Sequence, residues 1–257
     1  RSEQHHVKDN NTDTAKHAVN DDDHHSHNKN IINNDNDNNF NVNDVYDIDQ
    51  VLGEGGYGTV FLATRKADGR QVALKTMPRD LTDAADFGRE VQALRQLTYH
   101  GPHPHVVQMM DLHQDEEQYY LSLELVAGGE LLQRLIEDGP YSEAQAAVFV
   151  RQFAEALRFC HDTAGWIHGD LKLENLLLSS ADDRHAQLKV IDFGCAMPVN
   201  DNDNNKEDDE DGNNNNNNNS KEDQDFAGTP FYWPPELFVR PCRYTRAADL
   251  WAAGIIV

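Results

Sequence analysis

The feature that most constrains the fold is a glycine-rich segment between two strand-like segments. Gly53-Glu54-Gly55-Gly56-Tyr57-Gly58 follows a strand-like run over residues 46–52 and precedes another over residues 59–64. Glycines let backbone N–H groups approach phosphate oxygens closely, because no side chain intervenes. A similar spacing opens dinucleotide-binding folds, but there the glycines lead from a strand into a helix. The flanking strands therefore argue against that fold and predict a phosphate-binding turn within an antiparallel sheet.

Hydrophobic periodicity extends this sheet into a small lobe. A third strand is predicted over residues 71–77, and alternation of leucines with polar neighbours predicts another around residues 119–125. Between them, Phe87, Val91 and Leu94 recur at helical spacing. We expect a five-stranded antiparallel lobe with one helix over residues 46–126.

Beyond Gly128 the pattern becomes mostly helical. Apolar stripes predict one helix over residues 131–138, closed by Gly139, and another over residues 143–160, capped by Ser142. Two short apolar strands are expected at residues 176–178 and 188–191. A last helix is expected to begin near Thr245 and to be still running at Val257. This predicts a larger lobe over residues 127–257, and an α+β fold for the whole.

Chemically distinctive residues follow the glycine-rich segment in a fixed order. The segment Val72-Ala73-Leu74-Lys75 places Lys75 on the third predicted strand, and Glu90 lies on the next helix. His168-Gly169-Asp170-Leu171-Lys172-Leu173-Glu174-Asn175 follows, and then Ile191-Asp192-Phe193-Gly194. In this order, with Gly228-Thr229-Pro230, Pro234-Pro235-Glu236 and Asp249-Leu250-Trp251, the sequence resembles eukaryotic protein kinases from Tyr46 to its end.

The resemblance implies a bilobal fold and specific roles for single residues. Lys75 would contact the α- and β-phosphates of ATP and pair with Glu90. Asp170 would accept the proton of the substrate hydroxyl, and Lys172 would neutralise the transferring phosphoryl group. Asp192 would hold one Mg²⁺, and Asn175 a second.

The resemblance also implies a nucleotide site between the lobes. The loop glycines Gly53, Gly55, Gly56 and Gly58 would cover the phosphates of ATP. Leu123 resembles the residue that guards the back of the adenine pocket. Further contacts to the nucleotide are implied for Val60, Ala73, Glu124, Val126, Glu130 and Leu177.

Two features indicate the kinase type. Lys172 and Thr229 resemble serine/threonine kinases, because tyrosine kinases usually place other residues at both positions. The segment Leu125-Val126-Ala127-Gly128-Gly129-Glu130-Leu131 resembles the calcium/calmodulin-dependent and cyclic-AMP-dependent groups. We therefore expect serine or threonine as acceptor, and hypothesise that Glu130 favours basic residues upstream of it.

Gly169 stands where the family usually has an arginine that grips a phosphate on the activation loop. Asp225 occupies the position of the usual phosphosite, four residues before Thr229, and is already negative. We therefore predict activity that does not depend on phosphorylation of this loop. An alternative from another class is a non-catalytic nucleotide-binding pseudokinase or scaffold, which the intact Lys75 and Asp192 oppose.

Two segments differ in composition from the rest. Residues 1–44 contain twelve asparagines, and residues 200–225 contain eleven, together with many acids. Both contain too little apolar material to offset the entropy of ordering, so we expect a disordered tail over residues 1–45 and a low-complexity insert over 200–225. A third reading, an interaction protein acting through these tracts, rests on composition alone.

Charge and cysteine content limit the partners. The net charge of −23 repels nucleic acid and anionic lipid, and no apolar run is long enough for a membrane span. The three cysteines are an odd number and show no paired spacing of a disulfide framework or zinc site. This favours a reducing, intracellular and cytoplasmic location. ATP, Mg²⁺ and protein substrates are the expected partners, and oligomeric state is not indicated.

The family normally continues past the residue that matches Val257. We therefore expect a large lobe that is C-terminally incomplete. Glu236 is expected to be a buried carboxylate without its usual arginine partner, at a cost to stability.

Overall fold

The computed structural model describes residues 40–55, 58–182, 185–199, 228–239 and 244–257. The predicted tail up to residue 39 and the whole of the predicted insert lie outside these ranges. Within them, no helix is both long enough and apolar enough to cross a lipid bilayer.

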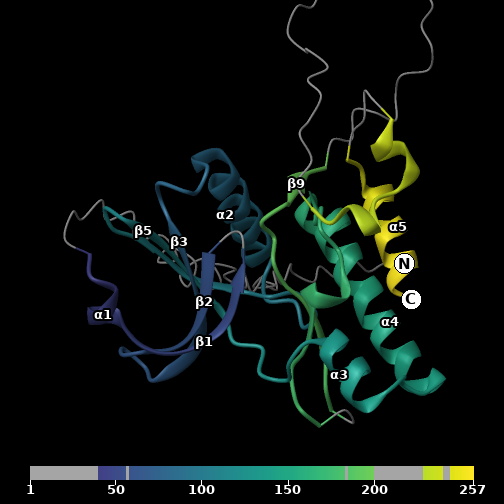
Figure 1. Cartoon of the computed structure of the whole chain (residues 1–257), viewed down its shortest axis with the longest axis horizontal. Coiled ribbons are helices and arrows are strands. Elements are labelled where there is room, and N and C mark those ends of the chain that lie inside the picture. Colours follow the sequence, from purple (N-terminus) through teal and green to yellow (C-terminus); the bar gives the residue numbers. More distant parts are fainter. Residues whose placement is uncertain (1–39, 56–57, 183–184, 200–227, 240–243) are drawn as a thin grey trace, which may run out of the picture. The chain divides into compact units, whose positions relative to one another are not determined.

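The small lobe is built on a five-stranded antiparallel sheet (Figure 1). Its strands are β1 (Tyr46–Gly55), β2 (Gly58–Arg65), β3 (Arg70–Pro78), β4 (Met109–Gln114) and β5 (Gln118–Glu124), in the order β1-β2-β3-β5-β4. The register pairs Gly55 with Gly58, so the glycine-rich segment is the tip of the β1–β2 hairpin. The prediction that the glycines lie between two strands is confirmed.

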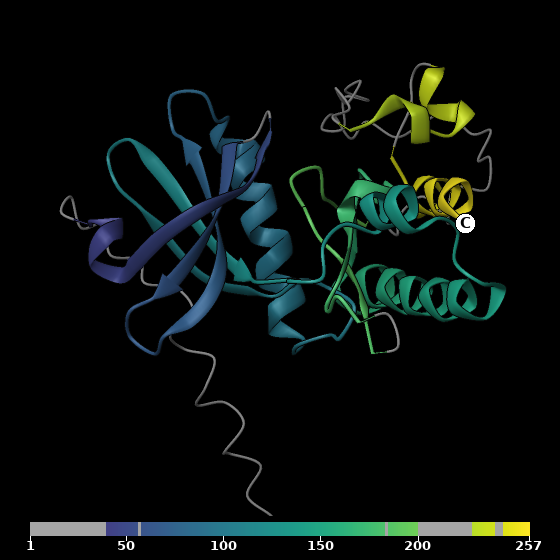
Figure 2. The same cartoon turned by 60° about the horizontal axis from the view of Figure 1, so that its bottom comes forward.

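Helix α2 (Ala84–Tyr99) lies against the sheet, as Figures 1 and 2 show. Asp83 caps its first turn by accepting hydrogen bonds from the N–H groups of Ala85 and Asp86. Its apolar face contributes Val91, Leu94 and Leu97 to the core. The same buried face carries Glu90, so the packing of α2 brings a carboxylate inside the lobe.

Part of the sheet is covered on both faces, which its alternating sequence does not indicate. Tyr120 and Ser122 of β5 are buried although they alternate with the apolar residues of the strand. A second cluster of Val42, Tyr46, Ala63, Val72, Leu74 and Tyr120 explains this. Val42 comes from α1 (Val42–Val45), and Phe40 stacks on His113 at a ring distance of 4.5 Å. The predicted end of the tail at residue 45 is therefore wrong, because residues 40–45 pack against the sheet.

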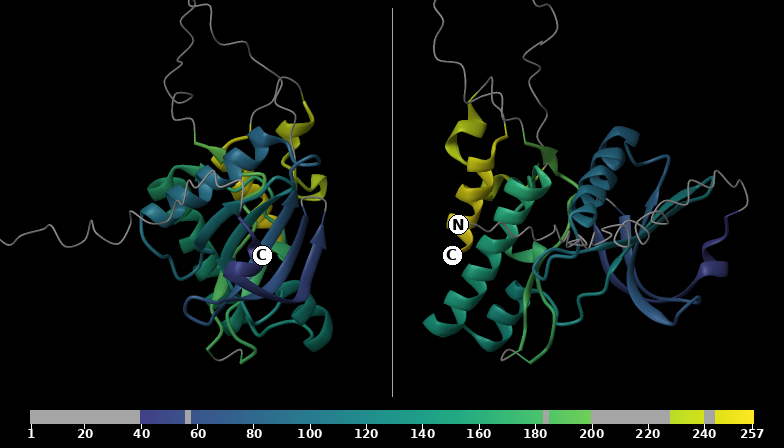
Figure 3. Two further views of the ribbon diagram at one scale, coloured as in Figure 1. Left: turned by 90° about the vertical axis from the view of Figure 1, so that its left-hand side faces the viewer. Right: turned by 180° about the vertical axis from the view of Figure 1, so that it is seen from behind.

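The large lobe is mostly helical, as predicted (Figure 3). Its α-helices are α3 (Leu131–Asp138), α4 (Glu143–Arg158) and α5 (Arg246–Ile256). Short helical turns are η2 (Phe159–Ala164), η3 (Leu173–Asn175), η5 (Pro230–Tyr232) and η6 (Pro235–Phe238). The predicted cap of α4 is present, because Ser142 Oγ accepts a hydrogen bond from the N–H of Gln145.

Two small strand pairs carry the loops between these helices. Strand β6 (Trp166–Ile167) pairs with β9 (Met197–Pro198), and β7 (Leu176–Leu178) pairs with β8 (Leu188–Val190). An isolated bridge joins Val106, just after α2, to Val190 of β8. The backbone after α2 is thus tied to the strands that hold the large-lobe loops.

The prediction of a buried Glu236 is wrong. This residue lies in the first turn of η6 and is exposed to solvent, so its carboxylate needs no buried partner.

Candidate active site

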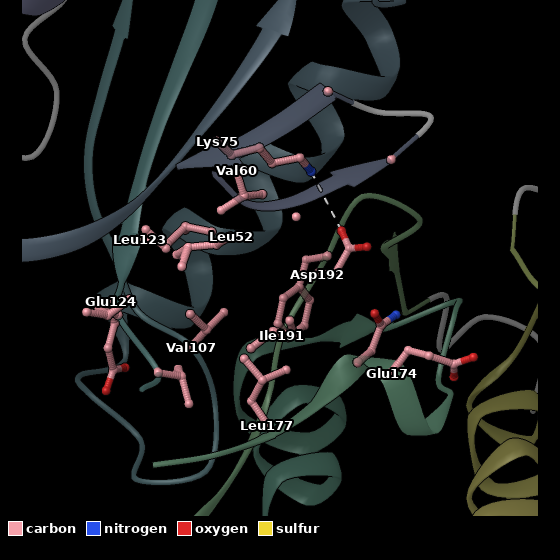
Figure 4. Close-up of a pocket in the computed structure, with 18 of the residues that line it drawn as sticks. Leu52, Val60, Lys75, Val107, Leu123, Glu124, Glu174, Leu177, Ile191 and Asp192 are labelled. Carbon is pink, nitrogen blue, oxygen red and sulfur yellow. Dashed lines mark ion pairs between the residues drawn. The ribbon is translucent and has the colours of Figure 1, made fainter. Parts of the chain in front are cut away.

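A cavity of about 330 Å³ lies between the sheet and the large-lobe loops. Figure 4 shows residues from both sides pointing into it, with Val60 and Lys75 on one side and Leu177 and Asp192 on the other. The predicted site residues that line it are Gly53, Gly55, Gly58, Val60, Ala73, Lys75, Glu90, Leu123, Glu124, Val126, Glu130, Asn175, Leu177 and Asp192. Segments far apart in sequence thus converge as expected for one ligand site.

Lys75 is the charged centre of the small-lobe side. Its Nζ lies 2.6 Å from Glu90 Oε1, and both side chains are almost completely buried. The same Nζ lies 3.6 Å from Asp192 Oδ1, the contact drawn as a dashed line in Figure 4. Burial alone lowers the pKa of Lys75, but the charges of Glu90 and Asp192 outweigh it and raise the pKa. Lys75 is therefore a permanent cation at the cavity wall.

Asp170 lies beside the cavity on the large-lobe side. Its Oδ2 accepts a hydrogen bond from Lys172 Nζ at 2.6 Å, and its Oδ1 accepts one from the Thr229 N–H at 2.8 Å. Burial raises the pKa of Asp170, but these hydrogen bonds and the Lys172 charge outweigh it and lower the pKa. The carboxylate is therefore ionised and available as a proton acceptor.

Lys172 connects Asp170 to the segment after the predicted insert. Its Nζ also donates to Thr229 Oγ1 at 3.1 Å. Neither Asp170 nor Lys172 lines the cavity itself, but Asn175, which does, donates its Nδ2–H to the Asp170 carbonyl oxygen at 2.8 Å. The predicted proton acceptor is thus held next to the predicted metal ligand.

Asp192 and Asn175 together fit a magnesium site. Carboxylate and amide oxygens are ligands that suit Mg²⁺, which commonly takes one or two protein ligands together with substrate phosphates. Asn175 uses its amide nitrogen for Asp170, which leaves the amide oxygen as the donor suited to a cation. Asp192 has a φ of 63°, and it is the one non-glycine residue with positive φ in the described part of the chain. Among the described residues, no cluster of three or more His, Cys, Asp or Glu is arranged to hold a metal ion.

The glycines of the hairpin tip differ in the reason why a glycine suits each position. Gly58 has a φ of 120°, and a Cβ there would lie 2.1 Å from the Thr76 carbonyl oxygen, so only glycine fits. Gly53 and Gly55 face open space, where the absence of side chains leaves the backbone accessible. Gly56, also predicted to contact phosphate, lies outside the described residues.

At the hinge end of the cavity, the side chain of Glu124 has a partner outside the cavity. The Glu124 carboxylate forms an ion pair with Lys189 Nζ at 2.8 Å, and Figure 4 shows this side chain directed away from Lys75. Any contact of Glu124 with a nucleotide therefore falls to its backbone. Val126 and the exposed Glu130 follow along the same edge of the cavity.

Several lining residues were not predicted: Leu52, Leu94, Val107, Leu125, Glu174, Ile191 and Phe193. Leu52 directly precedes the glycine-rich segment, so its place in the sequence could have indicated that it lines the cavity. Val107 had no such signal, because the bridge between Val106 and Val190 that brings it to the cavity is a long-range contact.

A buried carboxylate on α5 holds the loop that carries Asp170. Asp249 accepts hydrogen bonds from the N–H groups of His168 at 2.8 Å and Gly169 at 3.1 Å. Its Oδ2 also lies 2.7 Å from His161 Nε2. Asp249 appears in one of the sequence motifs, but its partners lie about eighty residues earlier, so sequence reasoning did not assign it this role.

Comparison with models of protein families identifies the family of this chain. The model of the protein kinase domain matches residues 46–257. This chain belongs to the protein kinase family. The match covers both lobes and every predicted site residue.

Known kinases similar to this chain come from plants and nematodes. It is 35% identical over 220 residues to calcium-dependent protein kinase 12 of Oryza sativa subsp. japonica, covering 84% of this chain and 37% of the relative. It is 35% identical over 217 residues to calcium/calmodulin-dependent protein kinase type II of Caenorhabditis briggsae, covering 83% and 36%. The chain thus spans little more than a third of the length of these relatives.

Proposed function

We propose that this chain transfers the γ-phosphoryl group of ATP to serine or threonine hydroxyls of proteins, with Mg²⁺. The observation that carries the proposal is the convergence of three charged groups. Lys75 and Asp192 lie 3.6 Å apart at the cavity wall, and the ionised Asp170 lies next to Asn175. This is the set of groups that phosphoryl transfer requires.

In the proposed mechanism, the substrate hydroxyl lies against Asp170. Its oxygen attacks the γ-phosphorus, the bond from that phosphorus to the β-phosphate oxygen breaks, and ADP leaves with the bond electrons. Asp170 accepts the hydroxyl proton through the carboxylate that Lys172 and Thr229 orient. Lys172 then lies where negative charge develops on the transferring group.

Lys75 positions the nucleotide from the other side of the cavity. As a buried cation paired with Glu90, it attracts the phosphates without having to be desolvated during binding. Asp192 and Asn175 would hold Mg²⁺, which supplies charge neutralisation of the phosphates and in-line geometry. Val60, Ala73 and Leu177 supply apolar walls for the base.

A peptide phosphorylation assay tests this function. We expect the purified chain to label peptides that contain serine or threonine, and to leave matched tyrosine peptides unlabelled. Asp192→Ala should abolish the labelling, and Asp138→Ala, an exposed residue at the end of α3, should not. Nucleotide binding without labelling of any peptide would instead favour a scaffold.

The contact of Lys172 with Thr229 supports the choice of acceptor. Both residues are features of serine/threonine kinases, and here they meet at 3.1 Å beside Asp170. Two exposed acids, Glu130 and Glu174, line the cavity nearby. We propose that they favour basic residues near the target hydroxyl. A peptide array without a basic preference would remove this part of the proposal.

We also propose that activity does not need a phosphate on the loop before Thr229. Support comes from Gly169, which offers no cationic side chain to bind such a phosphate. Asp225, the second reason for this prediction, lies outside the described residues. Phosphatase treatment should leave activity unchanged, and loss of activity after treatment would argue for a phosphosite such as Ser220.

A further inference from the structure

Gly169, directly before Asp170, sits where no side chain fits. It is buried and has a φ of 84°, in the left-handed region that favours glycine. A Cβ at this position would lie 2.2 Å from the carbonyl oxygen of Cys195 and 3.3 Å from its Cβ. Any other residue therefore requires one of the two backbone segments to move.

A third segment meets the same point. A Cβ on Gly228 would lie 2.9 Å from the Gly169 carbonyl oxygen and 3.5 Å from Asp170 Oδ1. The next residue, Thr229, donates its N–H to Asp170. Three backbone segments thus touch around Gly169 with no side chain between them.

Hydrogen bonds decide which segment would move. The Gly169 N–H is fixed to Asp249 Oδ1 at 3.1 Å, and the neighbouring His168 N–H is fixed to Asp249 Oδ2. Moving the Gly169 backbone would leave buried polar groups unpaired, which is costly. The cost of moving Gly169 therefore directs the displacement toward the Cys195 segment, which has hydrogen bonds of its own on either side.

Displacement of Cys195 would reach Asp192. The turn between them is closed by a hydrogen bond from the Ala196 N–H to the Phe193 carbonyl oxygen at 3.0 Å. On the far side, Met197 is held by its pairing with Ile167 in β6. A shift at Cys195 is thus transmitted toward the carboxylate of Asp192 rather than absorbed in a free loop.

We propose that Gly169 is a positioning residue that sets the spacing between Asp170 and Asp192. The proposal rests on the proposed function for what the two carboxylates do, but its geometry is independent of catalysis. It also means that arginine, the residue usual at this position in the family, does not fit this chain. Gly169→Arg should lower activity instead of making the kinase responsive to a loop phosphate.

Gly165 provides a matched control. It has a φ of 73°, but a Cβ there would meet nothing within 4 Å. Gly169→Ala and Gly165→Ala therefore impose the same kind of backbone strain, and only the first introduces a collision. Any difference between the two variants reports the contact with Cys195.

The primary experiment titrates Mg²⁺ against binding of a fluorescent ATP analogue. We expect Gly169→Ala to raise the Mg²⁺ concentration for half-maximal binding by about 10- to 100-fold, as for lost support of a metal ligand. Binding without Mg²⁺ should be unchanged, which shows that the variant is folded. Gly165→Ala should match the wild type, and an equal Mg²⁺ requirement in both variants would overturn the proposal.

Two further measurements keep the proposal testable if that variant folds poorly. In Gly228→Ala, the added Cβ would lie 2.9 Å from the Gly169 carbonyl oxygen, a less severe collision than that of Gly169→Ala with Cys195. This variant should give a smaller rise in the Mg²⁺ concentration for half-maximal binding. Melting temperatures without nucleotide should fall further for Gly169→Ala than for Gly165→Ala, and equal falls would contradict the close contact. If the wild-type chain labels no peptide, the proposed function fails, while these binding and melting comparisons still decide the role of Gly169.

Discussion

The two halves of the candidate site hold their charges by different means. In the small lobe, Lys75 and Glu90 are held by an ion pair between side chains of β3 and α2, and Lys75 also lies 3.6 Å from Asp192. In the large lobe, the loop of Asp170 is held through backbone groups, by the Thr229 N–H, by Asn175 and by Asp249. The first arrangement can be broken at a single side chain, whereas the second is fixed at several points.

This difference suggests a division of roles. The hydrogen-bonded ion pair between Lys75 on β3 and Glu90 on α2 links this helix to the sheet. A movement of α2 away from the sheet would therefore break the small-lobe half of the site. The hydrogen bonds that hold the Asp170 loop in the large-lobe half come from Thr229, Asn175 and Asp249, none of which lies on α2. Substitutions in the small-lobe half should therefore change mainly the stability of the fold. Substitutions in the large-lobe half should change mainly the rate of the chemical step.

The largest effect is expected for Asp170→Asn. Asparagine keeps an oxygen for the Thr229 N–H, so the fold should persist, but it cannot accept the substrate proton. We expect kcat to fall by about 10²- to 10⁴-fold with little change in melting temperature. Asp138→Asn, at an exposed position, is the control. A kcat close to the wild-type value would show that Asp170 is not the proton acceptor.

Breaking the buried ion pair between Lys75 and Glu90 should lower the stability of the fold more than Asp170→Asn does. Lys75→Met leaves Glu90 buried without its cation, and we expect the free energy of unfolding in urea to fall by about 3 kcal/mol. The double variant Lys75→Met/Glu90→Leu removes both charges and should recover most of that stability while remaining inactive. If the double variant is no more stable than Lys75→Met, the loss does not come from an uncompensated charge.

A smaller effect is expected on pH dependence. In the wild type, the pKa of Asp170 is held below its usual value, so its ionised form persists as the pH falls. Lys172→Met removes the opposing charge, and burial should then raise the pKa of Asp170 above its wild-type value. The acid limb of kcat/KM should shift to higher pH in the same direction. An unshifted limb would mean that Lys172 does not control ionisation of Asp170.

The smallest effect is expected at the apolar hinge end. Leu177 is partly buried and lines the cavity, so Leu177→Ala removes only part of an apolar contact. We expect KM for ATP to rise by about fivefold, the equivalent of about 1 kcal/mol, with kcat nearly unchanged. Leu81→Ala, which is 82% exposed, should leave KM unchanged. A large fall in kcat instead would place Leu177 in the chemical step.

The sequence was sufficient for features that depend on local pattern. Strand alternation, helical stripes and the order of motifs predicted the sheet, the main helices and the groups that meet at the cavity. Lys75 and Asp192 could be identified because their motifs are short and distinctive. Their positions follow from the pairing of adjacent strands and from the turn after β8.

Features that depend on distant packing were not predictable in the same way. The burial of Tyr120 follows from α1 covering the second face of the sheet, and the orientation of Glu124 follows from Lys189 on β8. The role of Asp249 depends on contacts across about eighty residues. The exposure of Glu236 contradicted a prediction based on family resemblance, because its turn faces solvent here.

The most direct test of the account is transfer of labelled phosphate from ATP to a basic serine peptide by the whole 1–257 chain. Wild type and Asp192→Ala should be compared across a range of Mg²⁺ concentrations, with nucleotide binding measured in parallel. The account predicts Mg²⁺-dependent phosphoserine formation by the wild type and none by Asp192→Ala. Equal peptide labelling by both, or none by a wild type that binds Mg²⁺ and ATP, would contradict it.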